Sequence, residues 1–109
     1  KAMQVRTRIR QDFEAVFKTY DVVIGPTTPT PAFKLGAHTS DPVAMYLEDI
    51  MTVAANLAGI PAVSLPIEGP GGLPVGLQLM AGQKQESVLL AVAEKLEKTL
   101  ATTLAEVQV

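Results

Sequence analysis

The stretch from Asp41 to Pro66, DPVAMYLEDIMTVAANLAGIPAVSLP, decides the fold because it holds both ends of one long helix and the strand that follows. Asp41 is a good N-cap, since its carboxylate can accept hydrogen bonds from the free amides of the first turn. Pro42 follows at the first helical position, where its missing N–H costs nothing. Gly59 permits a left-handed turn and Pro61 prevents the helix from continuing. We therefore predict a single helix that ends at Gly59 and leads directly into a buried strand.

The predicted helix has a broad apolar face and one narrow polar strip, at about 100° per residue. The apolar face holds Val43, Tyr46, Leu47, Ile50, Val53, Ala54 and Leu57, and the strip holds Glu48, Asp49, Thr52 and Asn56. A helix this apolar is mostly buried, so its strip either meets water or lines a site. Asp49 is the candidate site residue, because an ionised carboxylate in a dry interior is costly unless it is paired or hydrated. From the residues alone, it is either a surface acid or a ligand contact. Tyr46 and Met51 are expected in the core.

The residues before this helix predict another helix, a strand and a long loop. Apolar residues at helical spacing run from Val5 to Tyr20, and charged residues of both signs fill the opposite face. A basic helix can bind RNA, but the interleaved acids favour a solvated face. Residues 21–25, DVVIG, predict a strand buried on both faces of a sheet. The proline-rich loop from Thr27 to Ser40 is long enough to be functional, and its threonines either line a pocket or belong to a stiff surface loop.

The residues after this helix predict a hairpin and a last helix. Residues 62–66, AVSLP, lack clean alternation and predict a strand buried on both sides. Residues 68–72, EGPGG, form a five-residue loop that joins it to a strand over 73–80. Gly76 within that strand is typical of a close approach by another backbone. Residues 85–100 carry apolar side chains at helical spacing and predict the last helix.

The composition limits the classes of function. The chain has 109 residues, 48% of them hydrophobic and 18% charged, which fits one ordinary domain and argues against disorder. A formal net charge of −2 gives no field that would draw in nucleic acid or an anionic membrane. The absence of cysteine excludes disulfides and thiolate chemistry, and a zinc site would need carboxylates beside the single histidine, His38. The apolar runs are interrupted and no signal peptide is visible, so we expect a cytoplasmic protein.

The three serines do not provide a nucleophile. Ser64 lies inside a predicted strand, Ser87 starts a predicted helix, and Ser40 belongs to a turn. None is flanked by the glycines that would expose its oxygen on a strained turn. The sequence therefore predicts no catalytic residue within this chain.

Three motifs in a fixed order resemble one known family. The run MYLEDIMTVAANLAGIPAVSLP, with PTTPTPAF before it and GLPVGLQLM after it, is similar to the C-terminal part of the amidase-signature enzymes. Within that family it is most similar to the A subunits of the glutamyl-tRNA(Gln)/aspartyl-tRNA(Asn) amidotransferases. The resemblance implies that residues 1–109 are the C-terminal portion of one amidase-signature domain, an α/β/α sandwich with a mixed β-sheet. Lys1 is not an initiator methionine, which agrees with a cut within a longer protein.

The resemblance also implies what the longer protein does. It would hydrolyse glutamine, and the ammonia would convert Glu-tRNA(Gln) or Asp-tRNA(Asn) to the amidated form. The family's catalytic triad, Ser–cis-Ser–Lys, is formed by a Gly/Ser-rich stretch and a lysine upstream of it. Both would precede this chain. The 109 residues alone are therefore expected to be inactive. No cofactor is expected in this chain. ATP and Mg²⁺ would belong to the partner B subunit, which would also bind the aminoacyl-tRNA, and a small C subunit would brace the pair.

In the A subunits an acidic residue that matches Asp49 is implied to bind the α-ammonium of glutamine. Glu48 stands where the family usually has a short amide and Ala54 where proline is common, and both departures concern packing more than this role. One alternative is another amidase-signature hydrolase acting on a free amide, which has no use for an ammonium-binding acid. Another is a non-catalytic α/β module that binds a partner protein. A sheet cut from a larger one also predicts self-association of the fragment.

Overall fold

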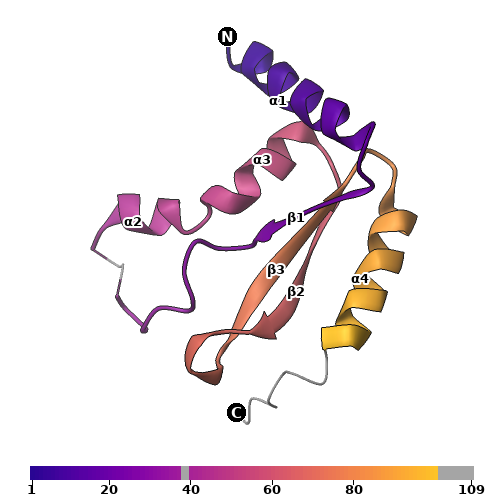
Figure 1. Ribbon diagram of the computed structural model, residues 1–109. Helices are drawn as coiled ribbons and strands as arrows, with labels where there is room; N and C mark the ends of the chain where they lie inside the picture. Colours follow the sequence, from indigo (N-terminus) through magenta and orange to yellow (C-terminus); the bar gives the residue numbers. More distant parts are fainter. Residues whose placement is uncertain (38–39, 101–109) are drawn as a thin grey trace.

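The computed structural model describes residues 1–37 and 40–100, which fold as helices packed around a three-stranded sheet (Figure 1). In chain order the elements are α1 (Ala2–Phe17), β1 (Val22–Pro26), α2 (Pro42–Leu47), α3 (Ile50–Ala58), β2 (Ala62–Glu68), the 3₁₀ turn η1 (Pro70–Gly72), β3 (Pro74–Ala81) and α4 (Glu86–Leu100). The predicted α/β class is confirmed. No described helix is both long and apolar enough to cross a bilayer. His38 lies outside the described residues.

The sheet has the strand order β1-β3-β2, and both pairings are antiparallel. β2 and β3 form the predicted hairpin, with Glu68 opposite Pro74 and the five residues 69–73 between them. Gly69 N–H donates to the carbonyl of Leu73 at 2.9 Å, which closes the loop. β1 lies on the other side of β3, with Val22 opposite Ala81. β3 would be an edge strand in the hairpin alone, and the pairing with β1 makes it the central strand of the sheet.

The long helix predicted from Asp41 to Gly59 is two helices, because the chain breaks at Glu48 and Asp49. Both expected ends are confirmed: Asp41 Oδ1 accepts from the amides of the first turn, and Gly59 is left-handed at φ 68°, ψ 37°. At the break, Asp49 N–H donates to the Tyr46 carbonyl in a tight three-residue turn. The Thr52 hydroxyl then donates to the Asp49 carbonyl at 3.0 Å. This hydroxyl adds a second donor to the Asp49 carbonyl at the start of α3, and the apolar periodicity of the sequence does not register the break that precedes it.

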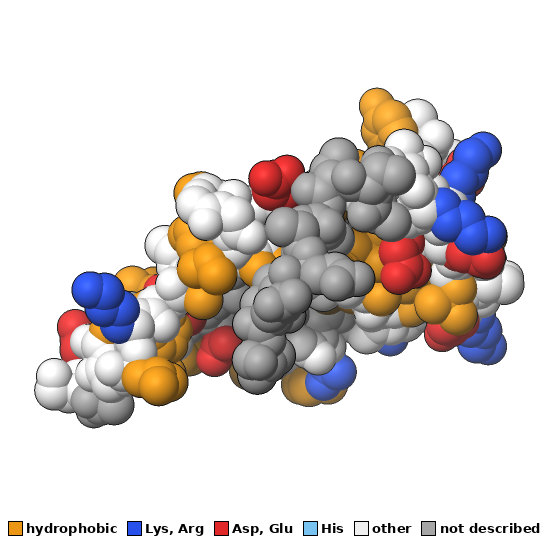
Figure 2. All heavy atoms as spheres, turned by 90° about the horizontal axis from the view of Figure 1, so that it is seen from below, with side chains coloured by type: hydrophobic (Ala, Val, Ile, Leu, Met, Phe, Trp, Pro, Cys, Tyr) orange, Lys and Arg blue, Asp and Glu red, His pale blue; other side chains and the backbone are white. Residues whose placement is uncertain are grey.

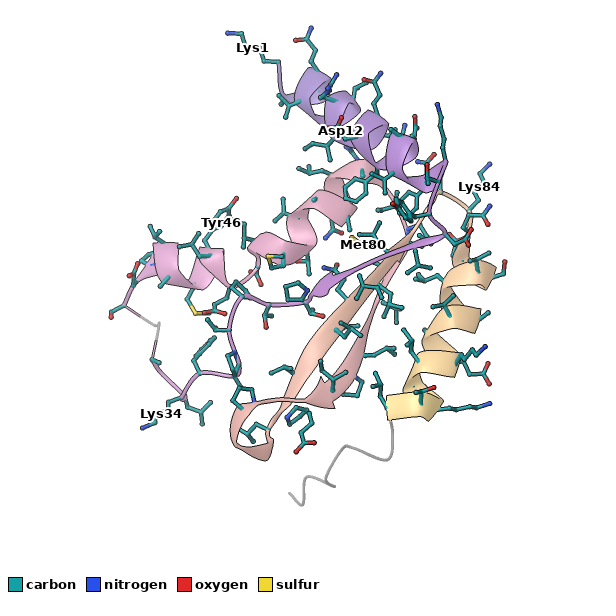
Figure 3. All side chains as sticks on the ribbon, viewed as in Figure 1. Lys1, Asp12, Lys34, Tyr46, Met80 and Lys84 are labelled. Atoms are coloured by element: carbon teal, nitrogen blue, oxygen red, sulfur yellow. The ribbon has the colours of Figure 1, made fainter. Side chains whose placement is uncertain are left out.

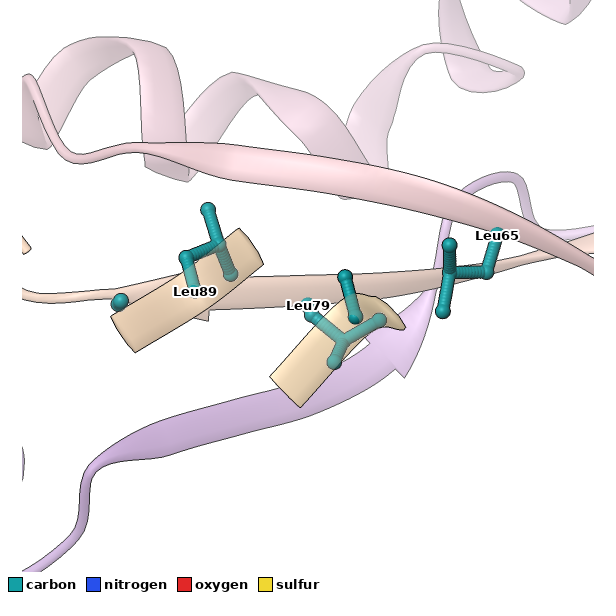
Figure 4. Packing of buried hydrophobic residues seen from close by; sticks show 5 residues of the cluster. Leu65, Leu79 and Leu89 are labelled. Atoms are coloured by element: carbon teal, nitrogen blue, oxygen red, sulfur yellow. The ribbon is translucent and has the colours of Figure 1, made fainter. Parts of the chain in front are cut away.

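The core lies between α4 and one face of the sheet (Figure 4). Its centre is Leu79, whose side chain is fully buried on the middle strand. The other buried members of the cluster are Leu65, Ala81, Leu89 and Ala93. Leucines of two strands therefore meet leucine and alanine of one helix. Burying a leucine side chain contributes roughly 1.5–3 kcal/mol, so this cluster dominates the stability of the chain.

The opposite face of the sheet, which we call the open face, is only partly covered, and three burial predictions are wrong. Along β2, exposed residues alternate with partly or fully buried ones, because α4 covers one face only. On β1, where a fully buried strand was predicted, Ile24 lies on the α4 face opposite Leu79 but is 56% exposed, because α4 packs mainly against β2 and β3. Tyr46, expected in the core, is 67% exposed and projects from α2 into solvent (Figure 3). Figure 2 shows hydrophobic side chains reaching the surface at the end of the molecule that holds α2 and the loop before it.

Two of the arginines on α1 hold the C-terminal end of α3. Arg6 Nε donates to the Leu57 carbonyl at 2.9 Å, and Arg10 Nε donates to the Ala58 carbonyl at 3.4 Å. The last carbonyls of a helix have no partner within it and carry the negative end of its dipole, so cations are favourable there. The predicted solvated face is confirmed for Arg8, which forms an exposed ion pair with Asp12. Arg6 and Arg10 instead connect α1 to α3.

Candidate functional site

The open face carries two neighbouring hollows, and the polar strip of the broken helix divides between them. The Asp49 hollow, of about 390 Å³, lies between the proline-rich loop, the α2–α3 junction and the start of β3. Its lining residues are Thr28, Thr30, Pro31, Ala32, Phe33, Met45, Glu48, Asp49, Pro74, Val75 and Gly76. The Gln78 hollow, of about 380 Å³, lies between α3 and the sheet. Its lining residues are Thr27, Thr52, Ala55, Asn56, Ile60, Ala62, Val63, Ser64 and Gln78.

Asp49, the predicted site residue, is exposed at the wall of the first hollow. It is the N-cap residue of α3, with φ −97° and ψ 0°, and its side chain caps no amide of that helix. Among the described residues, its carboxylate accepts no hydrogen bond and makes no ion pair, whereas its backbone carbonyl is used by Thr52. The break in the helix therefore turns Asp49 away from Thr52 and Asn56 and presents an available carboxylate to the hollow.

The neighbouring carboxylate is held by the loop. Thr30 Oγ1 donates to Glu48, at 3.0 Å from Oε1 and 2.9 Å from Oε2. Thr28 Oγ1 donates in turn to the Thr30 carbonyl at 2.8 Å, which stiffens the loop behind this contact. Of the two alternatives left open for the loop threonines, the structure favours pocket lining, since Thr28 and Thr30 line this hollow. The two adjacent acids therefore differ in their contacts. Glu48 is hydrogen bonded to the loop and holds it against the α2–α3 junction, whereas Asp49 faces the hollow between the loop and that junction.

The Gln78 hollow is uncharged and is built around one buried amide. Gln78 is 3% exposed, on the middle strand, and is the only buried polar residue within the described ranges. Its Nε2 donates to the Met51 carbonyl at 3.0 Å and to the Pro26 carbonyl at 3.3 Å. Both hydrogens of the amide are thereby used, and α3 is joined to the end of β1. Sequence reasoning missed this residue, although a single polar side chain in the apolar strand GLPVGLQLM is a signal that could have found it.

Gly76 separates the two hollows, and the close approach predicted there is made by side chains and not by another backbone. A Cβ at this position would lie 2.6 Å from Thr27 Oγ1 and 2.7 Å from Ser64 Oγ. These two hydroxyls are hydrogen bonded to each other at 2.7 Å, one on each side of the middle strand. Only glycine lets them meet across that strand. The Thr27–Ser64 contact is therefore part of the wall between the hollows.

Among the residues that the structure describes, the arrangement offers binding groups but no assembled nucleophile. Ser64 Oγ is bonded to Thr27, Ser87 lies in the exposed first turn of α4, and Ser40 precedes the N-cap Asp41. Within residues 1–37 and 40–100, no group of three or more carboxylate or histidine side chains could hold a metal ion. What the Asp49 hollow can do chemically is hold a cation: it has one available carboxylate, hydroxyls on its loop and apolar walls.

Sequence comparisons identify relatives over most of the chain. A family model described as amidase matches residues 1–90. The A subunit of the glutamyl-tRNA(Gln) amidotransferase of Geobacillus thermodenitrificans is 56% identical over 98 residues, which are 90% of this chain and 20% of that protein. The protein of the same name from Prochlorococcus marinus is 61% identical over 94 residues, 85% of this chain and 19% of that protein. The chain thus spans about 20% of the length of these curated relatives.

Solved structures with the same arrangement of elements give the same assignment. The crystal structure of the A subunit of glutamyl-tRNA(Gln) amidotransferase from Thermotoga maritima superposes with a TM-score of 0.83 at 40% identity, over 88% of this chain and 21% of that one. The 6-aminohexanoate cyclic dimer hydrolase superposes with a TM-score of 0.74 at 29% identity, over 91% of this chain and 23% of that one. The ordered motifs, the sequence matches and the fold agree, and the chain belongs to the amidase-signature family.

Proposed function

We propose that this chain is the C-terminal portion of the amidase domain in the glutaminase subunit of a tRNA-dependent amidotransferase, and that Asp49 binds the α-ammonium group of glutamine. The observation that carries the proposal is the available Asp49 carboxylate at the wall of a hollow large enough for an amino acid. The names of the similar A subunits from Geobacillus thermodenitrificans and Prochlorococcus marinus support the amidotransferase assignment.

The chemistry of the Asp49 hollow suits an amino acid substrate. An ammonium group gains a charge-assisted hydrogen bond from a carboxylate that no neighbouring group has already neutralised. Glu48, whose oxygens accept from Thr30, keeps the loop in place beside it. The apolar side chains of Phe33 and Met45 can pack against the methylene groups of the substrate. This chain would therefore bind and orient glutamine without taking part in bond breaking.

The remaining parts of the reaction are assigned to the rest of the longer protein and its partners. The Ser–cis-Ser–Lys triad upstream would hydrolyse glutamine and release ammonia, which would convert Glu-tRNA(Gln) or Asp-tRNA(Asn) to the amidated form. ATP, Mg²⁺ and the aminoacyl-tRNA would be bound by the B subunit, and the C subunit would brace the complex, in the cytoplasm. The 109 residues by themselves would be inactive.

The test is Asp49→Asn in the longer protein, assembled with its partners. Asparagine has nearly the same shape as aspartate, so the fold should be kept while the charge facing the ammonium is lost. A hydrogen bond to a charged group contributes roughly 1.5–3 kcal/mol, so kcat/KM for glutamine should fall on the order of ten- to a hundredfold. Ammonia supplied in place of glutamine should restore amidation, because the transfer step does not use this carboxylate.

Glu48→Gln is the matched control, since it removes a charge of the same sign from the same hollow. It should change the glutamine KM less than Asp49→Asn does. Normal use of glutamine by Asp49→Asn, or an equal loss of the ammonia-dependent reaction, would show that Asp49 is structural.

The second candidate, an amide hydrolase for neutral substrates, is favoured by the similarity to the 6-aminohexanoate cyclic dimer hydrolase. It predicts turnover of uncharged amides that Asp49→Asn leaves unchanged.

A further inference from the structure

Gln78 lines the neighbouring hollow, yet its amide is hydrogen bonded to both segments that form the walls of the Asp49 hollow. Its two hydrogens are donated to the carbonyls of Met51, at 3.0 Å, and Pro26, at 3.3 Å. Met51 is the second residue of α3 and follows Asp49 by two positions. Pro26 ends β1 and leads directly into the proline-rich loop. One buried amide therefore joins the beginnings of the two walls.

The two ends of α3 are held by different groups. Its C-terminal half contains its buried residues, Ala55 and Ala58, and α1 donates two arginine hydrogen bonds to its last carbonyls. Its first turn, residues 50–53, contains no buried residue, and Ile50 is 48% exposed. Among the described residues, Gln78 alone donates a side-chain hydrogen bond from the sheet to this helix. The end of α3 that carries Asp49 thus depends on Gln78.

The hydrogen bond to Met51 affects where the first turn of α3 lies more than whether it forms. A carbonyl oxygen has two lone pairs, so the Met51 carbonyl can accept from the helix amide four residues on and from Gln78 as well. Without Gln78, α3 would keep its own hydrogen bonds. Its first turn could then shift over the Gln78 hollow, which has a volume of about 380 Å³ between this helix and the sheet.

β3 also contributes to the Asp49 hollow directly. Gly76 and Gln78 are two positions apart on this strand, so both lie on the open face. Gly76 lines the Asp49 hollow, and its carbonyl accepts from Thr27 N–H at 3.0 Å, which holds the start of the loop on the same strand. A single strand therefore supplies part of the lining and, through Gln78, fixes the walls around it.

We propose that Gln78 is a positioning residue for the binding of glutamine, and that through the Met51 and Pro26 carbonyls it sets the Asp49 carboxylate against the proline-rich loop. The inference rests on the proposed role of Asp49. Gln78 is absent from the described residues that line the Asp49 hollow, so it acts through Asp49 and not by contact with the substrate. A hydrogen bond weakens steeply as its angle departs from linearity, so a small shift of α3 would weaken the hold on an ammonium group.

The test is Gln78→Met in the longer protein, assembled with its partners. Methionine has a similar length but no hydrogen to donate, so kcat/KM for glutamine should fall on the order of tenfold, chiefly through KM, while ammonia-dependent amidation is kept. In the Asp49→Asn background the same substitution should cause no further loss, because the carboxylate that it positions is gone. If Gln78→Met prevents assembly, Gln78→Asn, which keeps the amide on a shorter side chain, replaces it in the same comparisons.

Val92→Ala is the control for lowered stability. Val92 packs against the core on the α4 face, so its truncation should lower the Tm and leave the KM for glutamine unchanged. A rise in KM from Val92→Ala equal to that from Gln78→Met would show that any loss of stability disturbs glutamine binding, and would overturn the inference.

Amide hydrogen exchange in the longer protein gives a measurement that does not use glutamine. Gln78→Met should speed the exchange of Ala55, whose amide pairs with the Met51 carbonyl in the helical pattern, on the order of tenfold. The amide of Gly59, which donates to the Ala55 carbonyl at 3.0 Å at the other end of α3, should be unchanged. Equal acceleration at the two positions would show that α3 loosens as a whole, and would contradict a role at its first turn.

The kinetic outcomes separate this inference from the proposed function. A loss in Asp49→Asn without a loss in Gln78→Met would make Gln78 structural and leave the role of Asp49 intact. Equal losses from Gln78→Met in the two backgrounds would mean that it acts independently of Asp49, which would also overturn the inference. Unchanged use of glutamine by Asp49→Asn would remove the proposed function and this inference with it.

Discussion

The two faces of the sheet are built from the same three strands and have opposite properties. On the α4 face, Leu79 and Ala81 are fully buried and Leu89 is 3% exposed. On the open face, the same strands carry a buried amide, a pair of hydroxyls and two hollows. Alternation along each strand produces this division, because neighbouring residues point to opposite faces. One face holds the chain together, and the other presents groups for binding.

This difference means that stability and binding can be changed separately. Substitutions on the α4 face remove apolar contacts that the unfolded chain lacks, and they act on the free energy of unfolding. Substitutions in the hollows act on groups that face solvent or a ligand. Variants on each face, each compared with a matched control, measure how far stability and binding depend on different residues.

Leu79→Ala should give the largest loss of stability. The fully buried side chain at the centre of the core leaves a cavity, and large-to-small changes of this kind cost about 2–5 kcal/mol. Ile24, directly opposite Leu79 in the register but 56% exposed, is the control, and Ile24→Ala should cost less than about 1 kcal/mol. Urea denaturation followed by circular dichroism measures both. Equal losses would mean that β1 is as important to the core as β3.

Gly76→Ala should cost about 1–3 kcal/mol, because the new methyl group would press on a hydrogen-bonded pair of hydroxyls. The distances are 2.6 Å to Thr27 Oγ1 and 2.7 Å to Ser64 Oγ. Gly25→Ala is the control on the adjacent strand, where nothing lies within 4 Å of the new atom. Removing the Ser64 side chain as well, in Gly76→Ala/Ser64→Gly, should recover part of the loss. No recovery in the double variant would indicate that the hydroxyl contact is unimportant.

Arg6→Leu should cost about 0.5–1.5 kcal/mol, since it removes the donor to the Leu57 carbonyl at the end of α3. Arg8→Leu on the same helix removes only an exposed ion pair with Asp12, of the kind that contributes about 0.3–0.5 kcal/mol. Thermal unfolding of the two variants separates capping from surface charge. The reverse order would show that the arginines of α1 act through the ion pair.

Self-association should be the smallest effect, visible only at high concentration. Tyr46 is 67% exposed on a helix that buries none of its residues, and exposed apolar groups of this kind favour association. Sedimentation should show an average mass that rises with concentration, and Tyr46→Ser should reduce the rise more than Leu90→Ser on α4, which is 59% exposed. A strict monomer at all concentrations would remove this expectation.

Local signals predicted the parts of the fold that depend on a few neighbouring residues. The cap at Asp41, the left-handed Gly59 and the five-residue length of the hairpin loop were predicted correctly, with the loop one position later than expected, because turn and cap chemistry is short-range. The break at Glu48 and Asp49 was missed, because apolar residues continue at helical spacing on both sides of it. A hydrophobic pattern alone therefore does not distinguish one helix from two.

Burial was harder to predict than secondary structure. β-branched residues on β1 suggested a strand covered on both faces, but what covers a strand is decided by helices distant in the sequence. Ile24 lies on the same face as its partner Leu79, but α4 packs mainly against β2 and β3, which leaves Ile24 exposed. For the site, the sequence pointed to Asp49, whose role stays a prediction, and missed Gln78. The partners of Gln78 are the carbonyls of Met51 and Pro26, 27 and 52 positions away.

The strand order β1-β3-β2 also sets a sequence of events during synthesis. β1 leaves the ribosome first, yet its partner is the last strand made, and Gln78 contacts Pro26 across 52 positions. The β2–β3 hairpin has a short loop and can close within about 1–10 μs, whereas β1 must wait for the whole of α2, α3 and the hairpin. During that interval the apolar run VVIG lacks its β3 partner. Pro26 at its end, which lacks an N–H, shortens the length over which a nascent neighbour could capture it.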